Sequence, residues 1–360
     1  MLSRVAFISA AALGTLLLAG CLKTDRPAPE QNAICFQAGS LLLRDDATKT
    51  AIVHPQDASG HLPNNSQIAV YGWHAEGSED KWIFNGKDVS TTNGISWFYS
   101  PVEFWDWGSS SDYYDFIAVY PFDRIGTPTK TVSPRTRVAV SYNPVFRTNQ
   151  YDLMMAAYRR RQTDSNNKGN VPFAFQHMLS AVKIVLYNDS AGKDIKLKGF
   201  HFKNLVTSGN AIATFDSYGA PDYEWADATR TTLNCGGVSS IDERVDHKPA
   251  SGIQDKYDQT DDYDLMIPQR LDESIGGSSW PELVISYSVV SGESEQSKPS
   301  VTKNLKDMVL LSDKTTPILS WEAGRIYLYE IHLQVDGGIV VNVTTTDWDT
   351  ANAETPGILI

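Results

Sequence analysis

Short apolar runs separated by turn-forming residues fill this chain, and they limit its fold more than any other feature. Eleven runs of five to ten residues are broken by Gly, Pro, Asn, Asp and Ser. In the run 326–335 the residues Tyr327, Tyr329, Ile331 and Leu333 share one face, which is the period of a half-buried strand. Long helical periodicity is nearly absent. The sequence therefore predicts an all-β fold of the sandwich or barrel type. The predicted strands are 34–43, 67–74, 113–120, 137–142, 151–158, 181–188, 194–202, 211–215, 283–290, 326–335 and 339–346.

The length of 360 residues allows two domains of ordinary size, each with its own core. The most polar loop in the middle of the chain is 162–170, and polar loops of this kind often separate structural units. We therefore expect an N-terminal sandwich over residues 34–168 and a C-terminal sandwich over residues 169–360.

The first 20 residues have the composition of an export signal. A single charge, Arg4, precedes the apolar run Val5–Ala19, which is shorter than the roughly 20 residues of a membrane-spanning helix. Leu18-Ala19-Gly20-Cys21 matches the bacterial lipobox. This match predicts cleavage between Gly20 and Cys21 and a lipid anchor on Cys21. Residues 21–33 are polar and contain proline, so they are expected to form a tether from the lipid to the first strand.

Charge and cysteine usage narrow the functional classes. The 31 Lys and Arg residues against 43 Asp and Glu give a net charge of −12 and a pI near 5.0, which disfavours nucleic acid as a partner. Besides Cys21 there are only Cys35 and Cys235, with no metal-binding spacing. They could form a disulfide or remain two thiols. No metal ion or other cofactor is predicted.

Known catalytic motifs are missing from the sequence. There is no zinc-protease, phosphate-loop, dinucleotide or serine-hydrolase signature, and the seven histidines occur singly. His177, in Phe173-Ala-Phe-Gln-His177, is expected to form a hydrogen bond inside the sandwich rather than to catalyse a reaction. We therefore predict that the protein is not an enzyme.

A dense group of aromatic residues lies between positions 97 and 114 and includes Trp97, Trp105 and Trp107. Large rings commonly fill the end of a sandwich core, and this interpretation is favoured. Aromatic faces also stack on sugar rings, so an alternative is a surface lipoprotein that binds glycans through these three tryptophans.

Several motifs in a fixed order resemble those of the Bacteroidales fimbrillin family, which comprises lipoprotein pilin subunits and related cell-adhesion proteins. Each motif alone is weak, but together, behind a lipobox, they are specific. The motifs are Ile34-Cys-Phe36, Ile68-Ala-Val-Tyr-Gly72, Tyr114-Asp-Phe-Ile-Ala-Val-Tyr-Pro121, Tyr151-Asp-Leu-Met-Met-Ala156, the segment 171–184, Leu265-Met-Ile-Pro-Gln269, the segment 321–329 and the segment 343–348.

The resemblance implies two transthyretin-like β-sandwiches and an outer-membrane-bound precursor on the cell surface. It also implies that an arginine-directed protease trims the N-terminal strand and that a strand from another subunit fills the groove left behind. Arg44, in the polar turn after the first predicted strand, is the candidate cleavage site, with Arg26 in the tether second. An ordinary loop arginine is an equal alternative for Arg44, since an Asp follows it. The implied partners are other fimbrial subunits, membrane lipid and a surface ligand.

Overall fold

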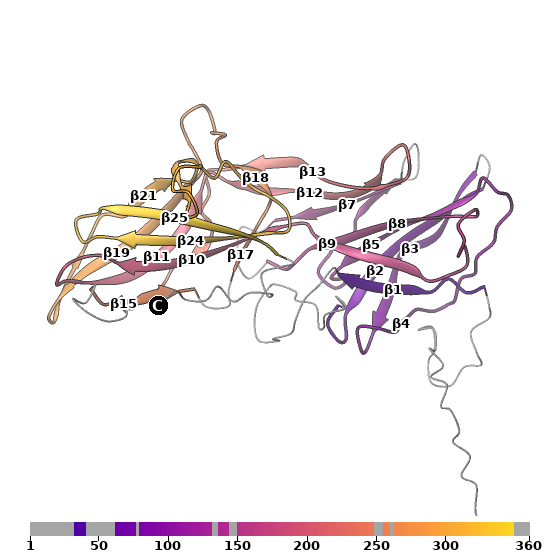
Figure 1. Cartoon of the computed structure of the whole chain (residues 1–360), viewed down its shortest axis with the longest axis horizontal. Helices are drawn as coiled ribbons and strands as arrows, with labels where there is room; N and C mark the ends of the chain where they lie inside the picture. Colours follow the sequence, from indigo (N-terminus) through magenta and orange to yellow (C-terminus); the bar gives the residue numbers. More distant parts are fainter. Residues whose placement is uncertain are drawn as a thin grey trace, which may run out of the picture.

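The structure is a computed structural model that describes residues 32–40, 62–76, 79–131, 136–143, 150–247, 255–259 and 263–348. Within these ranges it consists of β-strands and one short 3-10 turn, Leu305–Asp307, with no α-helix. The predicted all-β class is confirmed. None of these residues forms a helix with the length and hydrophobicity needed to cross a membrane. Figure 1 shows an elongated molecule with two lobes placed end to end.

The first lobe is a sandwich of a seven-stranded and a four-stranded sheet. The large sheet has the order β1-β9-β8-β5-β2-β3-β4, and the small sheet has the order β13-β12-β7-β6. The strands of the large sheet are β1 (Phe36–Ser40), β9 (Val171–His177), β8 (Met154–Arg161), β5 (Tyr113–Tyr120), β2 (Gln67–Glu76), β3 (Glu79–Thr91) and β4 (Trp97–Phe98). Those of the small sheet are β13 (Pro221–Arg230), β12 (Val206–Phe215), β7 (Arg137–Tyr142) and β6 (Thr129–Thr131).

The second lobe is a sandwich of two six-stranded sheets, with a two-stranded ribbon beside it. One sheet contains β16 (Lys256–Asp258), β10 (Ser180–Asn188), β24 (Arg325–Leu333), β25 (Ile339–Asp347), β22 (Val309–Leu310) and β17 (Asp264–Met266). The other contains β14 (Cys235–Val238), β11 (Asp194–Lys203), β19 (Glu282–Ser291), β20 (Ser294–Ser297), β15 (Glu243–Val245) and β21 (Val301–Asn304). The ribbon pairs β18 (Gln269–Arg270) with β23 (Ser320–Trp321).

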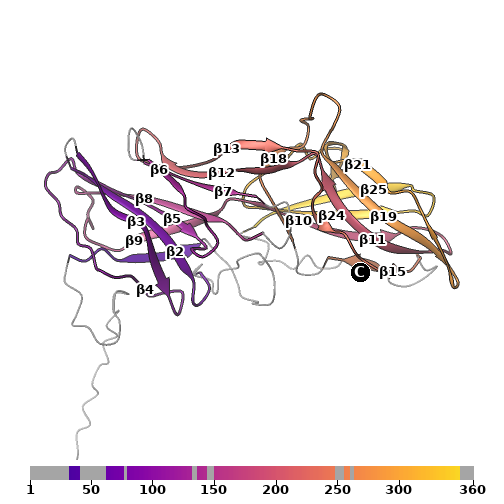
Figure 2. The same ribbon diagram turned by 180° about the vertical axis from the view of Figure 1, so that it is seen from behind.

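The chain passes between the lobes more than once. Only Met178 and Leu179 separate β9 in the first lobe from β10 in the second, and β11 in the second lobe leads directly to β12 in the first (Figure 2). Strands on both sides of the boundary expected at 168/169 therefore share sheets, because β9 pairs with β8 and β12 pairs with β7. The polar loop 162–170 is the turn between β8 and β9, not a linker between units.

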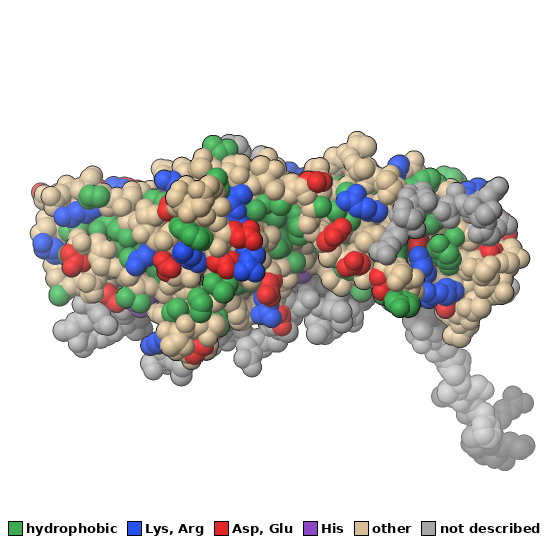
Figure 3. All heavy atoms as spheres, turned by 90° about the horizontal axis from the view of Figure 1, so that it is seen from above, with side chains coloured by type: hydrophobic (Ala, Val, Ile, Leu, Met, Phe, Trp, Pro, Cys, Tyr) green, Lys and Arg blue, Asp and Glu red, His purple; other side chains and the backbone are tan. Residues whose placement is uncertain are grey.

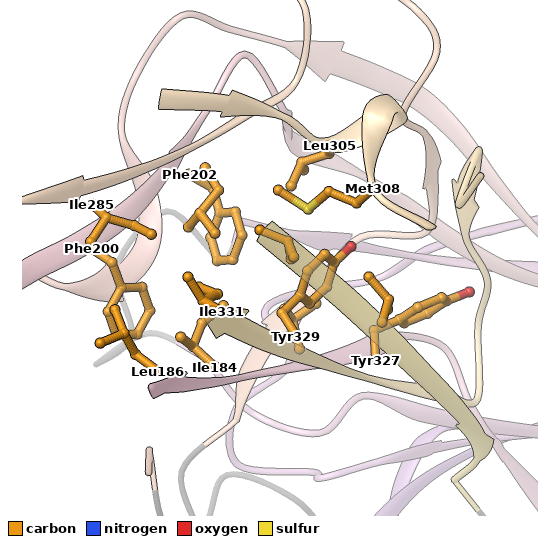
Figure 4. Close-up of a cluster of buried hydrophobic side chains, with 14 of the residues drawn as sticks. Ile184, Leu186, Phe200, Phe202, Ile285, Leu305, Met308, Tyr327, Tyr329 and Ile331 are labelled. Atoms are coloured by element: carbon orange, nitrogen blue, oxygen red, sulfur yellow. The ribbon is translucent and has the colours of Figure 1, made fainter. Parts of the chain in front are cut away.

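The second lobe has an apolar core between its two sheets. Figure 4 shows its side chains converging from β10, β11, β19 and β24, with Leu305 and Met308 closing one side. On β24 the residues Tyr327, Tyr329 and Ile331 are buried, whereas Leu328, Glu330 and His332 between and after them are half-buried. The alternation predicted for this strand is thus confirmed.

A network of four charged side chains covers part of the outer face of the second lobe. Lys198 Nζ lies 2.7 Å from Asp242 Oδ1 and 2.6 Å from Glu295 Oε1, and Lys196 Nζ lies 2.7 Å from Asp242 Oδ2. Hydrogen bonds from Lys198 and from Ser288 Oγ lower the pKa of Glu295 from 4.5 to about 2.

A carboxyl group whose pKa is depressed by folding stabilises the native state above its unfolded pKa. This stabilisation is lost as the pH falls from about 4.5 through about 2. We therefore expect Glu295→Gln to lower the urea midpoint at pH 7 and to have progressively less effect toward pH 2. Glu293→Gln is the control, because Glu293 is an exposed residue of the same hairpin that forms no hydrogen bond or ion pair with the described residues. A Glu295→Gln deficit that is the same at pH 7 and pH 2 would contradict the assignment.

Candidate functional site

The first strand, β1, forms one edge of the large sheet of the first lobe. It runs parallel to β9, with Phe36 opposite Val171 and Ser40 opposite Phe175. Because parallel strands cannot be joined by a tight turn, this pairing brings together segments that are about 135 residues apart in the sequence. Figure 1 shows β1, in indigo, along the lower edge of this lobe.

The inward side chains of β1 belong to a core on one face of the large sheet, which we call the inner core. Ile34, Phe36 and Ala38 are at most 2% exposed, whereas Gln37 faces solvent. The sheet curls, so that its two edge strands β1 and β4 come into contact. The buried members of the inner core are Ile34, Phe36, Ala38, Leu62, Ile68, Val70, Phe84, Val89, Trp97, Trp105, Tyr114, Phe116, Ala118, Met154, Ala156, Val171, Phe173 and Phe175.

Phe36 is surrounded by four aromatic rings of the inner core. Its ring stacks on Phe173 at 5.5 Å between centroids and meets Phe84 and Phe116 edge-on at 5.4 and 6.0 Å. Gly72 on β2 makes this packing possible, since a Cβ there would lie 2.9 Å from both Phe84 and Phe116. The Phe36 ring therefore connects the first strand to aromatic side chains of β3, β5 and β9.

A second segment, Tyr99–Trp105, holds the other side of the chain just before β1, and we call it the strap. The amide of Ile34 donates to the carbonyl of Glu103 at 2.8 Å, and the amide of Trp105 donates to the carbonyl of Asn32 at 2.8 Å. The Tyr99 hydroxyl donates to the carbonyl of Ile34 at 2.6 Å. Burial raises the pKa of Tyr99, which keeps this hydroxyl protonated. Two segments thus hold residues 32–40: the strap, which contacts residues 32–34, and β9, which pairs with residues 36–40. We call these two segments the walls of the slot.

The strap is itself fixed to the large sheet. The Tyr114 hydroxyl on β5 donates to the carbonyl of Asp106 at 2.8 Å and accepts from the amide of the same residue at 2.8 Å. Asp112 accepts hydrogen bonds from the amides of Gly108 and Ser109, both at 2.7 Å, and these bonds close the following loop. Hydrogen bonds to β5 directly after the strap therefore fix it to the rest of the first lobe.

The tryptophans of the aromatic group are mostly part of the core. Trp97 and Trp105 are 1% and 5% exposed, and Trp107 is half-buried with its ring stacked on Trp105 at 5.6 Å. Stacking on a sugar ring needs an open indole face. The structure does not present Trp97 and Trp105 in this way, because their faces are covered by the inner core, so it favours the interpretation of these residues as core.

The basic run Arg159–Arg161 ties the strands of the first lobe together. Arg159 Nε and Nη2 donate to the two carboxylate oxygens of Asp115 at 2.5 Å each, and the guanidinium lies 4.1 Å from the centre of the Tyr113 ring. Arg160 is buried and donates to the carbonyls of Asn166 and Asn170, both at 2.6 Å, which fixes the loop 162–170.

His177 lies where the two lobes meet. Its Nδ1 is 3.0 Å from Asp152 Oδ1, and its ring stacks on Trp348 at 4.3 Å. All three side chains are at most 5% exposed. The expected role of His177 as a hydrogen-bonding residue of the interior agrees with this position. Trp348, the residue directly after β25, thereby joins the second lobe to the first.

Other predicted site residues fall in two groups. Gly20, Cys21, Arg26 and Arg44 lie outside the described residues. Cys235 lies in the core of the second lobe and is not in a disulfide, so it does not pair with Cys35. The described residues contain no group of three or more His, Cys, Asp or Glu side chains placed to hold a metal ion.

Sequence reasoning did not identify the strap. Tyr99 appears in the sequence only as one member of an aromatic group, and Glu103 takes part through its backbone, for which no side-chain signal exists. For this site the sequence gives a signal only on the side of the first strand. The alternation in Ile34-Cys-Phe36 indicates which side chains of that strand point inward.

Comparison with known proteins bears on the resemblance drawn from the motifs. A family model described as fimbrillin-like matches residues 48–348. Among solved structures, the chain is similar to a fimbrial protein from Bacteroides vulgatus ATCC 8482, with a TM-score of 0.52 and 16% identity over 78% of this chain and 92% of that chain. It is also similar to a "putative cell adhesion protein" from Parabacteroides distasonis ATCC 8503, with a TM-score of 0.51 and 12% identity over 88% and 96% of the two chains.

At these identities the similarity to solved structures shows the fold alone. No curated protein sequence matches the chain. The family model, however, spans most of the chain and includes both lobes. The resemblance predicted from the motifs is confirmed, and the chain belongs to the fimbrillin-like family.

Proposed function

We propose that this protein is a structural and adhesive subunit of cell-surface fimbriae that assembles by exchange of its first strand. The observation that supports the proposal most is the position of β1. This strand fills a slot in the large sheet, it lies at the start of the described chain, and its inward residues complete the inner core. Its removal would leave the ladder edge of β9 unpaired and the aromatic group around Phe36 open to water.

Such a vacancy favours strand addition on physical grounds. An incoming extended segment supplies backbone hydrogen bonds to the open edge and side chains to the empty core positions. Burial of one phenylalanine, one isoleucine and one alanine side chain contributes several kcal/mol, at about 25 cal/mol per Å² of apolar surface. The same physics that holds β1 in place would hold the replacing strand of a neighbouring subunit.

Location at the cell surface follows from the family, and the lipid anchor is our proposal. Cleavage before Cys21 and lipidation of its sulfur and amino group would hold the precursor in the outer membrane. Residues 21–33 would then act as the tether between the lipid and β1. Other fimbrial subunits and a surface ligand are the proposed partners.

Cleavage at Arg44 is the step that can be tested most directly. Arg44 follows the last residue of β1, Ser40, by four positions, so a cut there separates the whole strand from the rest of the chain. With an arginine-specific protease, the mature chain should lose its N-terminal fragment and elute from gel filtration as ordered multimers.

The matched variants for this test are Arg44→Lys and Arg26→Lys. Arg44→Lys should keep the N-terminal fragment and stay monomeric, whereas Arg26→Lys should assemble as the unmodified chain does. Mass spectrometry of the products identifies the cut. A chain that loses its first strand and still remains a monomer at all concentrations would refute the proposed assembly.

A further inference from the structure

We infer that Tyr99 sets the register of the segment that fills the first position of the large sheet, and that this slot accepts an extended segment with aliphatic, aromatic and small inward residues at alternate positions. The inference rests on the proposed strand exchange and specifies the chemistry of the incoming partner. Its basis is the geometry of the two walls around residues 32–40.

The two walls contact different parts of the segment. The strap pairs with residues 32–34 through the hydrogen bonds of Glu103 and Trp105 and the antiparallel bridge between Ala33 and Phe104. β9 pairs with residues 36–40 in parallel. An occupant that only reached β9 would leave the amide of Trp105 and the carbonyl of Glu103 without the partners that they have here. A complete occupant therefore needs to cover the length of residues 32–40, which is about nine residues.

Tyr99 contacts both the backbone and a side chain of the segment that fills the slot. Its hydroxyl binds the carbonyl of Ile34, and its ring lies 5.5 Å from the ring of Phe36. The same side chain therefore contacts residue i through the backbone and residue i+2 through an aromatic ring. An occupant that satisfies both contacts has an aromatic residue two positions after the carbonyl that Tyr99 binds.

The inward positions of the slot differ in size. The Phe36 position is enclosed by four aromatic rings, whereas Ala38 is completely buried, so a larger side chain there would overpack the core. A shift of one residue would turn Cys35 and Gln37 inward and Phe36 outward, because successive side chains of a strand point to opposite faces. The order of residue types thus specifies one register.

The experiment uses the mature chain with a sequence-specific protease site inserted between Asp46 and Ala47. After cutting, the N-terminal fragment is held only by non-covalent contacts, and its replacement by a fluorescent peptide of residues 32–40 is followed by anisotropy under reducing conditions. Tyr99→Phe should accelerate replacement by about 2- to 12-fold, the effect of one lost hydrogen bond. A peptide carrying Phe36→Ala should bind at least about 10-fold more weakly.

Tyr158→Phe is the matched control, because the Tyr158 ring packs against the same inner core but forms no hydrogen bond and no aromatic ring pair with residues 32–40. Hydrogen exchange of the uncut chain supplies a second measurement, in which Tyr99→Phe should raise the exchange rate of the Ile34 amide more than Tyr158→Phe does. Equal behaviour of Tyr99→Phe and Tyr158→Phe in both measurements, with peptides that still enter, would overturn the role of Tyr99 and leave strand exchange intact. Failure of every peptide to replace the fragment would overturn the inferred partner together with strand exchange.

Discussion

Replacement of Asp115 by alanine should lower the free energy of unfolding by about 3–5 kcal/mol, because it leaves the mostly buried guanidinium of Arg159 without its carboxylate partner. The carboxylate of Asp115 is 1% exposed and the Arg159 side chain is 16% exposed. The two residues face each other on neighbouring strands β5 and β8, and both carboxylate oxygens are used. Arg159 also packs 5.1 Å from the Phe215 ring of the opposite sheet, so the pair connects the two sheets of the first lobe. Urea denaturation followed by circular dichroism measures the loss.

The control for this variant is Arg161→Ala, two residues further along the same strand. Arg161 is exposed and donates to the carbonyl of Tyr218, so its loss should cost about 1 kcal/mol or less. The double variant Asp115→Ala/Arg159→Ala should be less destabilised than the sum of its single variants, since neither charge is then left alone. If Asp115→Ala cost no more than Arg161→Ala, the ion pair would not have the importance that its burial suggests.

Phe36→Ala should cost about 3–5 kcal/mol, the usual range for a phenylalanine removed from a packed core. Phe36 is 2% exposed and is surrounded by Phe84, Phe116 and Phe173. Because β1 is a separate segment held by this ring and by its ladder to β9, the loss should appear first as faster hydrogen exchange in residues 34–38. Denaturation by urea then gives the total effect.

Gln37→Ala tests the opposite face of the same strand. Gln37 points to solvent, so its replacement should change stability by no more than about 0.5 kcal/mol. The comparison keeps the strand and its backbone pairing constant. Similar losses for Phe36→Ala and Gln37→Ala would mean that β1 is held by its backbone alone and that the inner core does not depend on it.

Much of the strand content could be predicted from local patterns. The predicted strands 113–120 and 137–142 coincide with β5 and β7, because apolar alternation and flanking turn residues mark both ends. Among the longer strands, the prediction does not include β3, β9 and β13. β13 is mostly polar and lies at the edge of its sheet, where few side chains are buried and no apolar alternation is required.

The arrangement of the strands could not be predicted in the same way. The polar loop 162–170 has the composition of a linker, yet its polar groups are used within the turn, as in the bond from Asn167 Nδ2 to the carbonyl of Gln162 at 2.6 Å. The parallel pairing of β1 with β9 and the return of β12 to the first lobe are non-local contacts. Nothing in a short window of sequence specifies them.

The candidate site could be predicted only in part, because local patterns reveal the first strand but not its non-local contacts. The inward residues of the first strand follow from the alternation of Ile34 and Phe36. The strap is a backbone interaction between segments about 70 residues apart, and it depends on how the large sheet curls. Figure 3 shows basic and acidic side chains interspersed over one face of the molecule, with no broad area of a single sign on that face.

The near-continuous path from β9 into β10 has a mechanical consequence. β9 carries the ladder of β1, and β10 carries the ladder of β24 in the second lobe, also in parallel. Tension applied to a strand in the position of β1 and to the far lobe would act along these strands, so the evenly spaced hydrogen bonds of each ladder would be loaded in shear and together, rather than opened one at a time. In a fimbria assembled by the proposed strand exchange, each junction between subunits would therefore resist pulling through a whole ladder of hydrogen bonds at once.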